Sequence, residues 1–374
     1  MLWLVLIVIA VALVLEWRSM SFPAEWVNYR REPSKRSVEP GEEFLLKTTI
    51  ENATKRNIPY LFVAEPLHET VKIVDKTGLD LTRNKNTVWQ RSTYFVRKRQ
   101  RVRRNLRVAI HERGMYKFEK AELRFGDFLG IKEIVREIKG HQNVVVYPNR
   151  LEDSRLQQVL SDIFGEVSVR SFLYEDPMLV MGYRDYTGRE PLKSISFPMS
   201  AKRNVLTVTE FDHTREEMVD LIFDVSYKGD FDHFAMQLET IFCMARTLCE
   251  GFEQKKLSYR LITNAFYASM EVRGVNVIQS GGSGGSSFRK ILEILGSSTG
   301  APMCKTGELL QYSFTSFSQE KEFVYISLRR EDDTQELIKR MERQYGQHIT
   351  CLYGEDFENS FLEEKREREE KRAC

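Results

Sequence analysis

The sequence predicts an N-terminal membrane helix followed by an all-β domain and an α/β domain. Three observations support this fold class. Residues 1–17 are almost entirely apolar, residues 41–140 hold short strand-like runs separated by turns, and residues 216–354 alternate strand-like with helix-like runs. Regularly spaced short strands favour an antiparallel β-sandwich of the immunoglobulin-like type, whereas the alternation favours a doubly wound sheet with helices on both faces.

Size and composition limit the classes of protein that the chain can belong to. With 374 residues and 42% hydrophobic content, the chain can form two domains with separate cores. Its 56 basic and 54 acidic residues give a net charge of +2, so bulk electrostatics does not favour a nucleic-acid partner. Its five cysteines form no CxxC pair, which favours a reducing compartment over a disulfide framework.

The N-terminal run from Leu2 to Leu15 predicts a membrane anchor. At ~1.5 Å per helical residue it covers about 22 Å, so it spans the ~30 Å hydrocarbon core only with bilayer thinning or a partner. Trp3 and Trp17 bracket the run and Arg18 follows it, as expected of residues at a membrane interface. A cleaved signal peptide and a buried core helix remain alternatives.

Basic residues follow the run rather than precede it, which places the downstream domains on the cytoplasmic side of a single-pass cell-membrane protein. These residues are Arg18, Arg30, Arg31, Lys35 and Arg36. We therefore divide the chain into an anchor at residues 1–17, a linker at 18–40, a β-sandwich at 41–140 and a connecting region at 141–215. An α/β domain at 216–354 and a charged tail at 355–374, helical or disordered, complete it.

The elements are expected in the following order. The predicted sandwich strands are Phe44–Glu51, Tyr60–Ala64, Val71–Val74, Val88–Val96, Arg101–Ile110, Gly114–Phe118 and Ala121–Phe125. A strand at Val144–Tyr147, a helix at Leu151–Phe164 and a strand at Val205–Phe211 follow. The α/β strands are expected at Met218–Val225, taken as fully apolar, Leu257–Thr263, Val272–Gln279, Phe323–Leu328 and His348–Tyr353. Its helices are expected at Phe231–Phe252, Phe288–Leu295 and Thr334–Tyr345.

A dense basic segment lies between Val96 and Arg107 and has three interpretations. It contains Arg97, Lys98, Arg99, Arg101, Arg103, Arg104 and Arg107. The first interpretation is a solvated strand face or an edge guarded by positive charge. The second is contact with anionic lipid headgroups close to the anchor. The third, nucleic-acid binding, is disfavoured because aromatic residues do not interleave with the basic ones.

Asp224-Val225-Ser226 closes the first predicted strand of the α/β domain and is a candidate metal site. A carboxylate and a hydroxyl two residues apart can face the same space, and hard cations such as Mg²⁺ prefer oxygen ligands. The arrangement resembles the Asp-x-Ser-x-Ser metal site of von Willebrand A domains, but Lys228 stands at the third position. A charged ammonium cannot ligate a cation, so Lys228 is expected to weaken the site or to occupy the cation's place. Thr263 and Asp332 are the later candidate ligands.

Other candidate motifs lack the residues that their chemistry needs. The loop Gly281–Ser287 lies between a strand and a helix, but it has neither the Lys-Ser/Thr of a phosphate-binding loop nor the glycines of a dinucleotide fingerprint. The six histidines have no zinc spacing, and Cys243 and Cys249 are expected in a helix core. No nucleophile and base pair is readable, so the sequence favours a protein that is not an enzyme.

The segment from Tyr183 to Lys202 follows neither helical nor strand periodicity and carries a recognisable motif. The residues of the motif are Tyr183, Arg184, Tyr186, Gly188, Leu192, Lys193, Ile195, Ser200, Ala201, Lys202, Leu206, Val208 and Phe211. They resemble the signature of the bacterial family called domain of unknown function fifty-eight, as does the stretch Phe125–Gly130. Phe197 and Pro198 stand where that family has Trp and Lys, and Lys202 stands in place of Arg.

The resemblance implies an architecture and a role. Members of that family have an N-terminal membrane segment, a β-sandwich and a von Willebrand A-like domain, and are usually encoded beside a MoxR-type AAA+ ATPase. This chain is therefore expected to be a membrane-anchored, non-enzymatic adaptor of such an ATPase in envelope or complex maturation. The alternative is a metal-dependent ligand-binding protein that uses Asp224 and Ser226. A phosphoester enzyme built on the Gly281–Ser287 loop is a third hypothesis.

Overall fold

The computed structural model describes part of the chain, in two compact units. The described residues are Trp3, Ile7, Ala10, Val14 and the ranges 24–75, 79–118, 120–126, 133–140, 142–173, 180–188, 192–211, 218–228, 233–267, 275–280, 285–315 and 321–373. One unit comprises Met1–Asn149 and Leu292–Ser297, and the other comprises Arg150–Ile291 and Ser298–Cys374. The predicted anchor, with Trp17 and Arg18, lies outside the described residues apart from the four scattered positions. Across the described ranges, no helix is long and apolar enough to cross a membrane.

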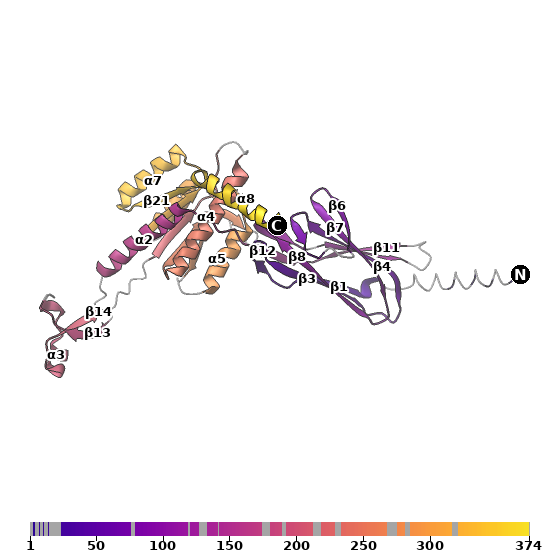
Figure 1. Cartoon of the computed structure of the whole chain (residues 1–374), viewed down its shortest axis with the longest axis horizontal. Helices are drawn as coiled ribbons and strands as arrows, with labels where there is room; N and C mark the ends of the chain where they lie inside the picture. The colour runs from indigo at the N-terminus through magenta and orange to yellow at the C-terminus, as the bar shows by residue number, and fades with distance from the viewer. Residues whose placement is uncertain are drawn as a thin grey trace. The chain divides into compact units, whose positions relative to one another are not determined.

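The first unit is a sandwich of two antiparallel sheets (Figure 1). One sheet has the order β1 (Val27–Pro33), β3 (Glu43–Asn52), β8 (Arg101–Ile110) and β5 (Val71–Ile73). The other has the order β11 (Glu133–Lys139), β10 (Lys120–Gly126), β4 (Ile58–His68), β7 (Thr87–Val96) and β6 (Asp80–Asn84). A small third sheet contains β2 (Ser37–Val38), β12 (Asn143–Val146) and β9 (Gly114–Lys117), and η1 (Ala24–Trp26) precedes β1.

The sandwich forms because its strands alternate inward apolar and outward polar side chains. Along β3 the buried positions recur at every second residue, and they include Phe44, Leu46 and Ile50. These side chains meet Leu61 and Leu67 of the opposite sheet in shared apolar clusters. Strand β1 also belongs to this domain, so part of the predicted linker at residues 18–40 is a sandwich strand.

A buried carboxylate lies between the two sheets. Glu65 of β4 is 1% exposed and accepts a hydrogen bond of 2.8 Å from the Thr48 hydroxyl. The hydroxyl of Tyr29 and the guanidinium of Arg104 also donate to it, and Arg31 lies 3.6 Å away. Burial alone would raise the pKa of Glu65, but the two guanidiniums hold it below its ordinary value. The carboxylate therefore stays charged and ties β4 to three strands of the opposite sheet, β1, β3 and β8.

The second unit contains a five-stranded sheet with the order β18 (Asn276–Ser280), β16 (Ser258–Thr263), β15 (Met218–Phe223), β20 (Glu322–Ser327) and β21 (Ile349–Tyr353). All neighbours run parallel except β18, which is antiparallel to β16. In chain order this sheet reads 3-2-1-4-5, so its topological switch point lies between β15 and β20. Ligand sites in such sheets form at the carboxyl ends of the strands at that point.

Helices cover both faces of this sheet. Helix α4 (Phe234–Gln254) contacts β16 and β20 on one face, where Phe242 packs 4.9 Å from Phe223, and it also contacts α2 (Ser154–Leu173) and α8 (Glu358–Ala373). On the other face, α6 (Thr306–Thr315) and α7 (Asp332–Tyr345) share an apolar cluster with Ile222 and Ile262. Because Ile222 and Phe223 are consecutive in a strand, they point to opposite faces. The remaining elements are α5 (Gly285–Ser297), β17 (Ala265–Tyr267), β19 (Ser298–Pro302) and η3 (Gly354–Phe357).

The first strand of this sheet is not fully apolar as the sequence pattern suggested. Asp220 in the middle of β15 is fully buried, and its carboxylate receives two hydrogen bonds from Arg260 of β16, one of them 2.7 Å long. Register places the two residues directly opposite one another. The charged pair is tolerated in the core because the guanidinium satisfies both carboxylate oxygens.

The motif segment, expected to have neither helical nor strand period, and the charged tail, expected to be helical or disordered, both contain helices. The motif segment forms the antiparallel pair β13 (Val180–Asp185) and β14 (Thr207–Phe211), joined through η2 (Leu192–Ser194) and α3 (Phe197–Arg203). Pro198 lies in the first turn of α3, where its missing N–H costs nothing, and Asn204 ends the helix in the left-handed conformation. The charged tail forms α8, whose Ser360 hydroxyl donates a 2.6 Å hydrogen bond to Asp153 at the start of α2.

Candidate functional site

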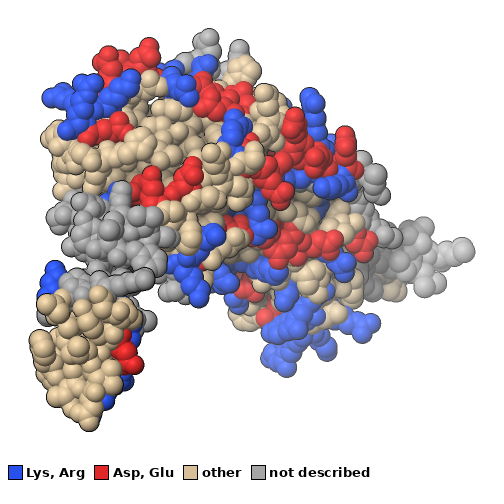
Figure 2. Space-filling view, turned by 60° about the vertical axis from the view of Figure 1, so that its left-hand side comes forward, with Lys and Arg blue, Asp and Glu red and all other residues tan. Residues whose placement is uncertain are grey.

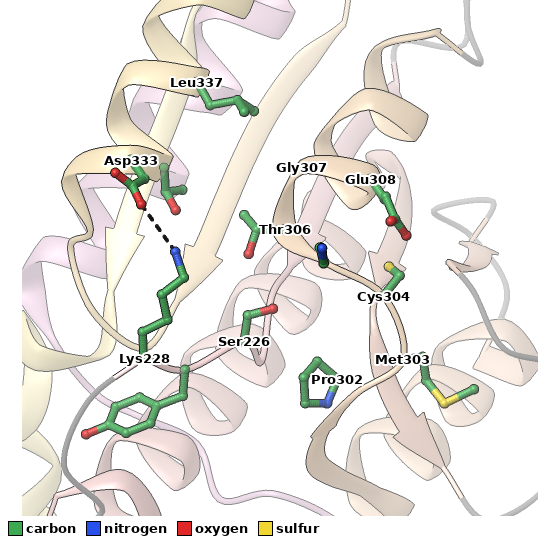
Figure 3. A pocket seen from close by; sticks show the side chains of 13 residues that line it. Ser226, Lys228, Pro302, Met303, Cys304, Thr306, Gly307, Glu308, Asp333 and Leu337 are labelled. Carbon is green, nitrogen blue, oxygen red and sulfur yellow. Dashed lines mark hydrogen bonds and ion pairs between the residues drawn. The ribbon is translucent and has the colours of Figure 1, made fainter.

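A pocket of about 720 Å³ lies at the carboxyl ends of β15 and β20, at the switch point of the α/β sheet. Ser226 and Lys228 follow β15, Thr306 begins α6, and Asp333 and Leu337 belong to α7. Figure 3 shows the hydroxyls of Ser226 and Thr306 facing the middle of the pocket, with Leu337 above them. The sequence placed Asp224-Val225-Ser226 at this edge, where ligand sites of such sheets usually form, and Ser226 lines the pocket.

Asp224 lies beneath the pocket rather than on its surface. It is 1% exposed, and three neutral groups donate hydrogen bonds to its carboxylate. These are the Tyr325 hydroxyl at 2.8 Å, the Asn264 side-chain amide at 2.7 Å and the backbone N–H of Ser226 at 2.8 Å. Burial raises the pKa of Tyr325 well above its ordinary value, so the phenol remains protonated and continues to donate. Asp224 thus joins the ends of β15, β16 and β20.

Asn264 organises the loop above that carboxylate. Its side-chain oxygen accepts the Val225 backbone N–H at 3.0 Å, while its amide also reaches the Ser226 hydroxyl at 3.0 Å. The same amide lies 3.3 Å from the Cys304 carbonyl oxygen, which belongs to the segment leading into α6. Burial raises the pKa of the nearby Cys304 thiol to about 11, so it is not an activated nucleophile.

Lys228 does not take the place of a cation next to Asp224. Its side chain is 70% exposed, and its ammonium lies 3.3 Å from Glu331. It also lies 3.4 Å from Asp333 at the start of α7 (Figure 3). Hydrogen bonding to Glu331, followed by the charge of Glu331, raises the pKa of Lys228. The lysine therefore links the loop after β15 to the loop before α7, which is a different role from the one expected.

The donor set does not fit a divalent cation as arranged. The oxygens of Asp224 accept protein hydrogen bonds, and Lys228 holds the third position of the sequence motif. Thr263 is buried and accepts the Ala265 N–H at 3.0 Å, so its hydroxyl serves a local turn. Within the ranges that the structure describes, no group of three or more His, Cys, Asp or Glu side chains is placed to hold a metal ion.

The motif residues between Tyr183 and Phe211 serve mainly to build the β13–β14 pair. The Ser200 hydroxyl donates to the Ser196 carbonyl at 2.7 Å and accepts the Thr207 N–H at 2.8 Å. The backbone of Tyr186 donates to Leu206 at 2.8 Å, and Arg203 donates to the Tyr183 carbonyl at 3.1 Å. A positive φ of 89° at Gly188 allows the chain to turn after β13. Arg184 pairs with Val208, and Lys193 and Lys202 are exposed.

Large apolar side chains on the same segment remain exposed. Leu192 is 73% exposed and Phe197 is 70% exposed, while Val205 and Leu206 are each half exposed. In the space-filling view, the part that holds β13, β14 and α3 presents a mostly uncharged face (Figure 2). Elsewhere on the viewed face, Lys and Arg side chains lie beside Asp and Glu. Exposed apolar side chains gathered on a small element are typical of a protein contact surface.

Sequence reasoning did not find three of the residues that shape the pocket. Asn264, Tyr325 and Thr306 were absent from the candidates, although Asn264 immediately follows a predicted strand at the sheet edge where ligands bind. That position was the available signal. The loop Gly281–Ser287, considered as a phosphate site and disfavoured, lies outside the described residues up to position 284, and α5 begins at Gly285. Cys243 and Cys249 are buried in α4, as expected.

Comparisons with known proteins give only weak likenesses. No family model and no curated protein matches the sequence. An alpha-2-macroglobulin from Salmonella is 13% identical, covers 33% of this chain and 9% of its own, and has a TM-score of 0.25. A CARDB domain from Pyrococcus furiosus, solved with di-metal ions, is 12% identical over 33% of this chain and 97% of its own, at a TM-score of 0.20. A cohesin module from Clostridium perfringens is 10% identical, covers 32% of this chain and 94% of its own, and has a TM-score of 0.23. Scores this low support no conclusion about function.

Proposed function

We propose that this protein is a membrane-anchored, non-enzymatic adaptor whose α/β domain docks a partner protein at the switch-point pocket. The observation that carries the proposal is the state of Asp224 under the pocket floor. Its carboxylate already accepts three hydrogen bonds from neutral donors, so it is committed to holding the strand ends together. A carboxylate in this state has little acceptor capacity left for a substrate proton, which favours recognition over catalysis.

The rim of the pocket has the mixed character of a protein-binding surface. Lys228 carries positive charge, Asp333 and Glu308 carry negative charge, and Met303 and Leu337 add apolar area. Such a combination suits a partner surface with its own apolar anchor and a few charges. The exposed Leu192, Phe197, Val205 and Leu206 of the motif segment provide a second candidate contact.

We also infer that the α/β domain is von Willebrand A-like. The sheet order 3-2-1-4-5 and the position of Asp224-Val225-Ser226 directly after the first strand support this inference. The motif between Tyr183 and Phe211 resembles the family called domain of unknown function fifty-eight, and that resemblance supports a MoxR-type AAA+ ATPase as the partner. The inference about the partner rests on the resemblance alone.

Co-purification from solubilised membranes tests the proposal. We expect the full-length protein to recover a MoxR-type ATPase. Lys228→Glu should reduce that recovery by about tenfold, because the partner surface that complements Lys228 is negatively charged and would be repelled by a glutamate. The matched control is Lys339→Glu, which reverses an exposed charge on α7 outside the pocket. No ATPase with the unaltered protein, or equal loss with both variants, would contradict the proposal.

The rival function is that of a metal-dependent ligand-binding protein. It predicts Mg²⁺ binding in a calorimetric titration, which the adaptor does not require. Mg²⁺ binding would require Asp224 to release Asn264 or Tyr325, and Ser226 and Thr306 would supply the hydroxyl ligands. Saturable heat on addition of MgCl₂ that disappears in Asp224→Asn would favour the rival over the adaptor.

A further inference from the structure

Three segments of the first unit meet at one end of the sandwich. Strand β1 begins there, because Val27 pairs with Asn52 at the end of β3. The β3–β4 connection and the β7–β8 connection cross between the sheets at the same end, since Ile58 pairs with Val96. We call residues 53–57 and 97–100, together with Trp26, the basic tip.

Buried Asn52 holds the two connections of the basic tip together. Its side-chain amide donates to the carbonyls of Arg56 at 2.8 Å and of Arg97 at 3.0 Å, one in each connection. Two further bonds join the connections, from the Arg99 N–H to the Thr54 carbonyl at 3.1 Å and from the Lys98 N–H to the Asn57 side chain at 2.9 Å. The tip is therefore a preorganised surface and not two independent loops.

The charged side chains of the basic tip are all cationic. The two connections read Ala-Thr-Lys-Arg-Asn and Arg-Lys-Arg-Gln, and contain five basic residues and no acidic one. The five basic side chains, which are Lys55, Arg56, Arg97, Lys98 and Arg99, are all exposed. Arg99 adopts a φ of 53°, a left-handed conformation that glycine or asparagine would accept at lower cost. An arginine at this position adds positive charge to the surface, and its left-handed backbone conformation costs local strain.

Three exposed aromatic side chains lie in the strand ends and the short helix that adjoin the two connections. Trp26 at the start of β1 is 59% exposed, Phe95 at the end of β7 is 53% exposed, and Tyr60 near the start of β4 is 41% exposed. Gly126 of β10 lets Tyr60 lie against the sheet, since a Cβ at that position would come within 2.8 Å of its ring. Exposed aromatic rings next to Lys and Arg are typical of surfaces that rest in the headgroup region of a bilayer.

The chain connects the basic tip directly to the apolar N-terminal run. Eight residues separate Leu15, the end of the apolar run, from Ala24, the start of η1, so nine Cα-to-Cα steps join them. At about 3.4 Å per residue the connection reaches at most about 30 Å, in any conformation. A membrane that holds the anchor therefore keeps the basic tip close to its surface, at a high effective concentration.

We propose that the basic tip docks on anionic lipid headgroups and so fixes the sandwich against the membrane. Charge complementarity selects the lipid, because each Lys or Arg near an anionic surface strengthens binding about fivefold. Trp26 and Phe95 supply the apolar contact at the headgroup level. This surface lies in the first unit and is separate from the pocket proposed to bind a partner protein.

Lysine reactivity of the full-length protein in nanodiscs tests the proposal. Acylation rates of Lys55 and Lys98 are compared between discs of phosphatidylcholine and discs in which about one third of the lipid is phosphatidylglycerol. We expect both rates to fall at least threefold with the anionic lipid, and to recover in about 0.5 M NaCl, where the Debye length is about 4 Å. Lys72, exposed at the opposite end of the sandwich, serves as the internal reference and should react equally in both discs.

Two matched double variants separate charge from folding. Arg97→Gln with Arg99→Gln removes two charges from the basic tip and is expected to weaken docking about 25-fold, so that Lys55 and Lys98 lose their protection. Arg83→Gln with Lys85→Gln removes two charges at the β6–β7 turn, at the other end of the sandwich, where Lys85 has a similar φ of 46°. This control variant should retain the protection of Lys55 and Lys98. Protection that is equal in neutral discs, persists in salt, or survives the first double variant would overturn the proposal.

Discussion

At the residue scale, the burial of Asp224 predicts that the stability of the protein depends on the Tyr325 hydroxyl. Tyr325→Phe should destabilise the protein by about 1–3 kcal/mol, because one oxygen of the buried carboxylate loses its donor. Tyr345→Phe is the matched control, since Tyr345 at the end of α7 stacks on Phe314 of α6 and is 39% exposed. The free energy of unfolding in urea measures both. Equal small effects would mean that Asp224 is solvated and available for a ligand.

The sequence places some residues of the site and not others, for a physical reason. Asp224 and Ser226 were predicted together because both lie on one continuous segment after a strand. Asn264 and Tyr325 reach Asp224 from β16 and β20, and such pairings depend on sheet order and register, which local patterns do not contain. For the same reason, the ion pair between Lys228 and Glu331, which lie far apart in the chain, could not be predicted from the sequence.

At the element scale, Asp153 couples the start of α2 to α8 in a pH-dependent way. It accepts the Arg155 backbone N–H at 2.8 Å, as a helix N-cap does, and the Ser360 hydroxyl of α8 at 2.6 Å. The Arg155 side-chain hydrogen bond lowers the pKa of Asp153 to about 2 from its ordinary 3.8. The carboxylate therefore adds stability above about pH 4, and this contribution disappears as the pH falls toward 2.

The expected result is a pH-dependent difference between two proteins. Near pH 6, the free energy of unfolding of Asp153→Asn should be about 1–2 kcal/mol lower than that of the unaltered protein. This value allows for solvent screening, because Arg155 is half exposed. Near pH 2 the difference should approach zero. Asp162→Asn, at an exposed carboxylate on the same helix, is the control. A difference that stays constant across this pH range would show that hydrogen-bond geometry, and not charge, carries the effect.

Elements with strong periodicity were predicted, and those set by tertiary context were not. Strands such as β3 and β8 match the expected ranges within one residue because apolar and polar side chains alternate along them. Strand β1 was assigned to a linker because Arg30, Arg31 and Glu32 hide the pattern. Arg31 is nevertheless buried, next to Glu65 of another strand. Helix α6 was missed because Gly307 and its polar residues weaken the helical signal.

At the whole-molecule scale, the division into a sandwich and an α/β domain follows from the change in periodicity along the chain. The exact boundary could not be predicted, because β12 belongs to the first unit although it follows the expected end of the sandwich at residue 140. Among the described residues, each unit buries a cluster of oppositely charged side chains in its core, around Glu65 in the first and around Asp220 in the second. The two clusters share no residue, so each one can be disrupted separately.

This separation predicts two local responses in hydrogen exchange. Glu65→Gln should leave Arg31 and Arg104 without their counter-charge, and Arg260→Met should leave Asp220 without its partner, at a cost of about 3–5 kcal/mol each. Because the two cores are distinct, we expect Glu65→Gln to accelerate amide exchange in β3, β4 and β8, and Arg260→Met to accelerate it in β15 and β16. A second substitution, Asp220→Leu, should restore much of the stability lost in Arg260→Met by removing the unpaired charge. Exchange that accelerates equally across both units in either single variant would mean that the chain unfolds as one cooperative body, against the division into two cores.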